Sequence, residues 1–201
     1  MELILIRHAR PLREHRADGA AANPGLDAEG REQAEHLARW LAVERIDAIV
    51  SSPARRAWQT AEPLAAALGL QVGVVDALRE FDTGANEYVP VEELTVDDPR
   101  WQAMVRGEFY GCADPEAFRR RVIDGVEQLV DAHPGGRVAA FSHAGTINVY
   151  TAHVLSIAGN MWFAPGYASI TRITASRDGR RGVLSVNEAG HLHPAYLTVA
   201  R

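Results

Sequence analysis

The chain has 201 residues, 47% of them hydrophobic, so it is long enough to bury a substantial core as one domain. Its formal net charge of -5 argues against a general nucleic-acid-binding protein, because such proteins usually present a basic surface. All 21 basic residues are arginines, which excludes Schiff-base chemistry and phosphate binding by a P-loop lysine.

Cysteine content and the lengths of the apolar runs predict the cellular location of the protein. Cys112 is the single cysteine, which excludes an intramolecular disulfide and a CxxC metal site. The N-terminal apolar run is broken at Arg7, and no stretch approaches the roughly 20 apolar residues of a membrane span. We therefore expect a cytoplasmic protein without a membrane or nucleic-acid partner.

Short apolar runs alternate with helical patterns along the chain. The runs predict buried strands at 3–6, 46–50, 72–75 and 137–141. Capping residues and periodicity predict helices from Asp27 to about Val43, from Ser52 (N-cap) and Pro53 (first helical residue) to near Gly69, from about Pro115 to Ala132, and after Gly145 to about Ser156. Leu37, Trp40 and Leu41 are expected on the apolar face of the first helix.

The remaining segments complete the expected architecture. Segments 168–176 and 182–187 flank "SRDGRRG", which predicts a hairpin or a wide turn. Alternation of strands and helices favours an α/β three-layer sandwich, with a mostly parallel central sheet and helices on both faces. Residues 82–114 fit neither pattern, so we expect one domain over 1–201 with a lid-like insertion at about 82–114.

Two of the predicted strands end on a histidine. "LILIRHAR" runs into Arg7 and His8, and "VAAFSHAG" runs into Ser142 and His143. In open α/β sheets, ligands bind outside the carboxyl ends of the strands. The two imidazoles, beside an arginine, therefore indicate a functional site.

A third motif, "SSPARRAWQTAE", places two arginines at the start of a predicted helix. The helix dipole disfavours cations there, so an anion nearby would explain a positive charge at this point. We assign Arg56 to that role, and we expect Arg55 to be an exposed arginine.

Five blocks occur in an order typical of a known family. "LILIRHAR", "GLDAEGREQA", "SSPARRAWQTAE", "LREFDTG" and "SHAGTI" resemble the blocks of the histidine phosphatase superfamily, branch 1, the phosphoglycerate mutase-like proteins. The resemblance covers roughly residues 1 to 190. It places the family's Arg-His pair on Arg7 and His8, its next arginine on Arg56, its acidic residue on Glu80 and its second histidine on His143.

The resemblance implies a phosphohistidine at His8 that is then hydrolysed, with Glu80 first as general acid and then as base. Arg7 and Arg56 suit the negative charge of a phosphoryl group in transfer, and His143 supplies another donor. Because the arginines neutralise that charge, we expect neither a metal nor a cofactor.

Departures from the family pattern lie near the expected substrate. Arg10 stands where a glutamate is common, and it is a candidate for substrate binding. Arg10, Arg13 and Arg16 either hold a second anionic group or face water. Residues 82–114 carry eight acidic residues against two arginines. They either form a lid suited to a monophosphate ester with a neutral or apolar body, or remain solvated away from the substrate.

The leading function is therefore a phosphomonoester hydrolase acting on a small phosphorylated metabolite. A phosphoglycerate mutase is the alternative, although mutases of this family tend to be longer, and this chain stops soon after "HLHPAYLTVAR". A phosphate-binding module without turnover is disfavoured, because binding alone needs neither His8 as nucleophile nor Glu80 as acid. A homodimer stays open.

Overall fold

A six-stranded sheet forms the centre of the computed structural model, which describes residues 1–196. Residues 197–201, the end of the segment invoked in the comparison with longer mutases, lie outside the described residues. In spatial order the strands are β4 (Val72–Val74), β3 (Ala48–Ser51), β6 (Arg137–Ser142), β1 (Glu2–Arg7), β7 (Ile170–Ala175) and β8 (Arg181–Glu188).

Strand register brings the two predicted site segments to the same end of this sheet. β1 runs parallel to β6, with Arg7 opposite Ser142, and β3 runs parallel to both β6 and β4. β7 and β8 continue the sheet in antiparallel fashion. The carboxyl ends of the parallel strands therefore lie side by side, where ligands bind in such sheets.

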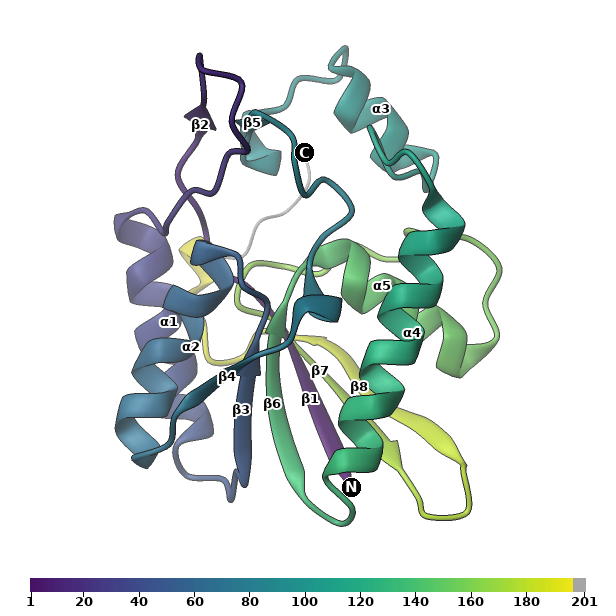
Figure 1. The fold of residues 1–201 in the computed structure, drawn as a ribbon. Coiled ribbons are helices and arrows are strands. Elements are labelled where there is room, and N and C mark those ends of the chain that lie inside the picture. The colour runs from purple at the N-terminus through teal and green to yellow at the C-terminus, as the bar shows by residue number, and fades with distance from the viewer. Residues whose placement is uncertain (197–201) are drawn as a thin grey trace.

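Helices cover both faces of the sheet, which confirms the predicted three-layer α/β sandwich (Figure 1). Ile4 and Ile6 pack toward α1 (Ala28–Leu41) and α2 (Arg55–Leu68). Leu3 and Leu5 alternate with them and pack toward α4 (Pro115–Ala132) and α5 (Ala144–Leu155). Within residues 1–196, no helix has both the length and the apolar character needed to cross a membrane.

The start of α2 differs from the prediction. The predicted cap, Ser52, and the predicted first helical residue, Pro53, both precede the helix, whose N-cap is Ala54. The Ser52 hydroxyl lies 2.9 Å from Nε2 of His143, so it is part of the site as well as an acceptor for the Ala54 N–H. The α1 prediction is wrong at Trp40, which is 49% exposed although Leu37 and Leu41 are buried.

The segment 82–114 contains short elements and lies beyond the carboxyl ends of the strands (Figure 1). β5 (Glu87–Tyr88) pairs with β2 (Glu14–His15), and a turn of 3-10 helix (Val91–Glu93) and helix α3 (Pro99–Val105) follow. The stacked rings of Phe81 and Phe109, 4.8 Å apart, join Phe118 of α4 and anchor the segment to the core.

Candidate active site

The two histidines predicted from the strand ends lie together. His8 follows β1, and His143 follows β6 as the N-cap of α5. Their ring centroids are 5.1 Å apart, and both side chains are buried. Arg7, His8, Arg56 and Glu80 line a cavity of about 840 Å³, and His143 lines a smaller one that shares Arg56.

The hydrogen bonds of His8 define its tautomer. Nδ1 lies 2.8 Å from the carbonyl oxygen of Ala9, which can only accept, so Nδ1 carries a proton. Nε2 of the neutral ring is then unprotonated, and its lone pair accepts a 3.3 Å hydrogen bond from Nε of Arg56. This arrangement leaves an unprotonated nitrogen beside Arg56, in a residue that lines the cavity.

The surroundings of both histidines keep them neutral. Burial lowers the pKa of His8 well below its usual value, and the positive charges of Arg56 and Arg7 lower that pKa further. The pKa of His143 is lowered well below its usual value by burial first and then by Arg56 and His8. At neutral pH the positive charge at this end of the sheet therefore resides on the arginines.

Each of the two site arginines lies against a tyrosine ring. The guanidinium carbon of Arg7 is 4.0 Å from the ring centroid of Tyr167, and that of Arg56 is 4.5 Å from Tyr88. Cation–π contact orients a guanidinium without neutralising it. The nearest carboxylate oxygen to Arg56, on Asp82, is 3.9 Å away, which leaves this buried cation weakly paired.

Glu80 is a buried carboxyl group beside these cations. Its Oε2 accepts a 2.8 Å hydrogen bond from the Gly145 N–H in the first turn of α5, and its Oε1 accepts one from Phe81. Burial, followed by repulsion from Asp82, raises the pKa of Glu80 to about 7. Such a group holds or releases a proton near neutral pH.

Gly145 allows this approach because it has no side chain. A Cβ at this position would lie 2.4 Å from Oε1 of Glu80 and 2.7 Å from the ring of Phe81. The glycine of the "SHAGTI" block therefore leaves room for the carboxyl group that the resemblance assigns as the acid.

Sequence reasoning missed two residues that hold this geometry. Arg121 of α4 donates to four backbone carbonyls, of which those of Arg79 and Glu80 lie 3.1 and 3.5 Å away. Thr60 accepts a hydrogen bond from the Ala9 N–H and donates to the Arg56 carbonyl, joining the β1 loop to α2. Helical periodicity at Thr60 is the only signal for either residue, since it places Thr60 on the same face as Arg56.

Arg10 is the one sequence-predicted site residue that the structure does not bring to the others. Its guanidinium forms ion pairs with Asp27, Glu29 and Glu92, and Arg10 is not among the residues lining either cavity. Carboxylates from two other segments therefore satisfy it. Arg55, as predicted, is exposed beside the buried Arg56.

Asn148, which follows the "SHAGTI" block, has a structural role in this chain. Its side-chain oxygen accepts from the N–H groups of Trp162 and Phe163, and its amide donates to two carbonyls. The described residues contain no group of three or more His, Cys, Asp or Glu side chains placed to hold a metal ion.

Known protein families and sequences match most of the length of this chain. A family model described as the histidine phosphatase superfamily (branch 1) matches residues 3–188. A bifunctional protein of Mycobacterium tuberculosis is 32% identical over 198 residues, which cover 94% of this chain and 54% of the relative. The chain thus spans about half the length of the mycobacterial relatives it matches.

Two further relatives match end to end. Phosphoserine phosphatase 1 of Hydrogenobacter thermophilus is 28% identical, with 98% of this chain and 97% of the relative covered. The solved structure of a mycobacterial glucosyl-3-phosphoglycerate phosphatase with inorganic phosphate has a TM-score of 0.76 and 25% identity, covering 96% and 99% of the two chains. On the match over residues 3–188, this chain belongs to the histidine phosphatase superfamily, branch 1.

Proposed function

We propose that the protein hydrolyses phosphomonoesters of small metabolites through a phosphohistidine at His8. The observation that carries this proposal is the neutral His8 ring, whose unprotonated Nε2 accepts a hydrogen bond from Arg56 where both residues line the cavity. A phosphate bound between Arg56 and Arg7 would present its phosphorus to the lone pair of Nε2. Two weakly paired cations, the buried Arg56 and the half-buried Arg7, suit a dianion, which supports phosphate as the ligand.

In the first step, the Nε2 lone pair of His8 forms a bond to phosphorus while the ester P–O bond breaks. Arg7, Arg56 and His143 stabilise the charge on the equatorial oxygens, and Glu80 gives its proton to the leaving alcohol oxygen. The pKa of about 7 at Glu80 supports this role, because a protonated fraction is present at neutral pH.

In the second step, Glu80 takes a proton from water, whose oxygen attacks phosphorus. The P–N bond breaks, its electron pair returns to Nε2, and inorganic phosphate leaves. Arginine charges supply the neutralisation that a metal clamp provides in other phosphoryl-transfer enzymes, so the proposed reaction is metal-independent. The names of the relatives, a phosphoserine phosphatase and a glucosyl-3-phosphoglycerate phosphatase, support hydrolysis of phosphorylated metabolites.

The test uses p-nitrophenyl phosphate with a labelled phosphoryl group and a rapid quench into alkali. The alkaline quench is needed because phosphohistidine is acid-labile. We expect label on His8 and no label in His8→Ala, in the presence of EDTA as well as in its absence. A separate arm with 3-phosphoglycerate distinguishes release of phosphate from isomerisation to the 2-phosphate. An acid-stable adduct, label on serine, or loss of labelling in EDTA reversed by Mg²⁺ would contradict the proposal.

The coarser features of the chain also support proposals about its setting. We propose one domain over residues 1–201, since helices from both halves of the sequence cover one sheet. The lone cysteine supports a cytoplasmic location.

Leu184 and Val186, exposed on the edge strand β8, support a homodimer. Sedimentation of wild type and Leu184→Glu tests the dimer, because a charge there should yield monomers.

A further inference from the structure

Beyond its phosphate end, the cavity is walled by two kinds of side chain. The apolar side chains of this lining, which are called the apolar wall below, are Val89, Val91, Leu94, Met104, Tyr110 and Met161. Apart from Asp82, which lies beside Arg56, the charged residues that line this part of the cavity are the carboxylates Glu87, Asp98 and Glu108 and the guanidinium of Arg100. Glu108 pairs with Arg106 at 2.9 Å, and Arg106 does not line the cavity. This part of the cavity therefore presents three carboxylates and one arginine to a bound alcohol.

Arg100, the one cation of that part of the cavity among the described residues, is fully engaged. Asp98, the N-cap of α3, accepts from Nε at 2.9 Å and from Nη2 at 2.7 Å, and Glu87 accepts from Nη1 at 2.9 Å. Hydrogen bonds to Arg100 lower the pKa of Asp98 to about 2 and lower that of Glu87, so both stay ionised. Every guanidinium nitrogen of Arg100 thus already contacts a carboxylate.

The arginines of the 10–16 loop are paired in the same way. Nε of Arg10 is 2.8 Å from Glu92, and Arg13 lies 3.2 Å from Glu87 and 3.7 Å from Glu93. Arg16 pairs with the neighbouring Asp18 at 2.7 Å. None of these arginines lines the described cavity, so the insertion places carboxylates, and not free cations, around a bound alcohol.

We propose that the protein selects phosphomonoesters whose alcohol part carries no carboxylate or second phosphate and lies against the apolar wall. This inference rests on the proposed function and names the substrate class of that site. A second anion in the substrate would meet three carboxylates and no unengaged cation among the described residues lining this part of the cavity, and like charges at close range disfavour binding. The carboxylate-bearing substrates in the names of the relatives, phosphoserine and glucosyl-3-phosphoglycerate, would therefore be poor substrates of this chain.

Matched substrates test this selection. Phosphoethanolamine differs from phosphoserine by one carboxylate, and glycerol 3-phosphate has a hydroxymethyl group where 3-phosphoglycerate has a carboxylate. We expect kcat/KM to be at least about tenfold higher for the ester without the carboxylate in each pair. We also expect hexyl phosphate to exceed ethyl phosphate, because its longer chain reaches the apolar wall. Equal or reversed preference in the matched pairs overturns the inference.

A gain-of-function variant adds a second test. Glu87→Gln with Asp98→Asn removes two charges and releases Arg100, while asparagine retains the cap of α3. We expect the kcat/KM ratio of 3-phosphoglycerate to glycerol 3-phosphate to rise about tenfold in this variant. The control, Glu93→Gln with Asp97→Asn, removes two charges of the same insertion that do not line the cavity and should leave the ratio unchanged.

These outcomes distinguish failure of the proposed function from failure of the proposed substrate selection. The assignment of selectivity to Glu87 and Asp98 is contradicted if the kcat/KM ratio is unchanged in the variant that releases Arg100. It is also contradicted if the ratio rises equally in the control. Hydrolysis of none of the esters, with no phosphoenzyme, overturns the proposed function and this inference together. Hydrolysis with a preference for the carboxylate-bearing esters overturns the inference alone.

Discussion

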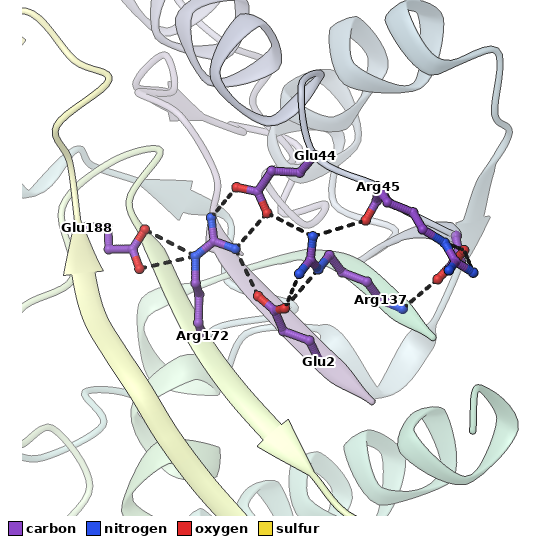
Figure 2. Close-up of polar contacts among 7 residues, drawn as sticks. Glu2, Glu44, Arg45, Arg137, Arg172 and Glu188 are labelled. Carbon is purple, nitrogen blue, oxygen red and sulfur yellow. Dashed lines mark hydrogen bonds and ion pairs between the residues drawn. The ribbon is translucent and has the colours of Figure 1, made fainter. Parts of the chain in front are cut away.

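At the amino-terminal end of β1, Glu2 belongs to a network of ion pairs, whereas the cations at the carboxyl end of the same strand lack such partners. In the network, Arg172 contacts Glu2, Glu44 and Glu188 at 2.6 to 3.2 Å (Figure 2). Arg137 joins it by pairing with Glu2 and Glu44. Each carboxylate of this network faces at least one guanidinium.

The carboxyl end is arranged differently. Nε of Arg7 and Nδ1 of His143 are buried without a hydrogen-bond partner among the described residues. Arg56 has its nearest carboxylate oxygen at 3.9 Å. Buried polar groups without partners cost stability, and they gain most when a ligand supplies those partners. The paired end therefore contributes stability, while the unpaired end is prepared for an anion.

The largest expected effect is on activity, at the unpaired end. Arg56→Ala should lower kcat/KM for a phosphomonoester by roughly 10³-fold or more, since arginine charge on a transferring phosphoryl group is worth that much. The neighbouring Arg55→Ala is the matched control, because Arg55 is exposed and outside the cavity lining. Its kcat/KM should stay within a few-fold of wild type. Similar losses in both variants would show that helix position, and not the buried charge, sets the effect.

Glu80→Gln should follow in size. An alkoxide leaves poorly without a proton, so phosphoenzyme formation from an alkyl phosphate should slow by roughly 10²- to 10³-fold. A nitrophenolate leaves well unaided, so formation from p-nitrophenyl phosphate should slow far less. The comparison is made in the burst phase by rapid quench, because the second step also uses Glu80. Equal losses for both esters would leave Glu80 a structural or electrostatic role only.

At the paired end, Arg172→Met should change stability and leave turnover unaltered. Its side chain is 14% exposed; Glu188 would lose its guanidinium partner, and Glu2 and Glu44 would keep only Arg137, so we expect a loss of about 3 kcal/mol. That corresponds to a fall in Tm of about 6 to 12 °C. Arg180→Met is the control, because Arg180 pairs with Asp178 at an 84% exposed position and should cost little.

The same variant has a pH signature in thermal unfolding. Hydrogen bonds from Arg172 lower the pKa of Glu44 below its unfolded value of 4.5. This stabilisation is present above pH 4.5 and is lost as the pH falls through the lowered pKa. The stability difference between wild type and Arg172→Met should therefore shrink in acid. A difference that is constant with pH would mean that packing, and not charge pairing, makes the contribution of Arg172.

The contrast between the two ends also explains what the sequence could predict. Arg7, His8 and His143 follow apolar runs directly, and strands that lie parallel bring their carboxyl ends together. Arg56 was predictable because local helix electrostatics disfavour a cation in the first turn of a helix. Both signals come from the immediate surroundings of the residues in the chain.

Residues whose role depends on distant segments gave no such signal. Arg121 reaches the carbonyl oxygen of Glu80 from another element, and Tyr88 meets Arg56 only when the insertion folds over the sheet. Arg10 was placed in the site because it follows His8 closely. Carboxylates of the 27–29 segment and of the insertion hold its guanidinium away from the cavity. Neighbourhood in the sequence therefore predicted the backbone position of Arg10 and not its contacts.

The smallest expected effect concerns Asp82, which is the nearest carboxylate to Arg56 and also acts on Glu80. Burial is the first cause of the raised Glu80 pKa and repulsion from Asp82 the second. As the acid, Glu80 must be protonated, so alkyl phosphate phosphorylation should decline above a pKa near 7. Asp82→Asn removes the repulsion and lowers that pKa. The basic limb of the burst-rate profile should therefore move toward lower pH.

Asp97→Asn is the control for this profile, since Asp97 is exposed in the same insertion and does not line the cavity. Its basic limb should coincide with that of wild type. Because the pKa of His8 lies well below 6.5, the acid limb should lie below that pH in all three proteins. A basic limb that stays in place in Asp82→Asn would show that burial alone sets the proton affinity of Glu80. Asp82 would then act at this unpaired end only as the distant partner of Arg56.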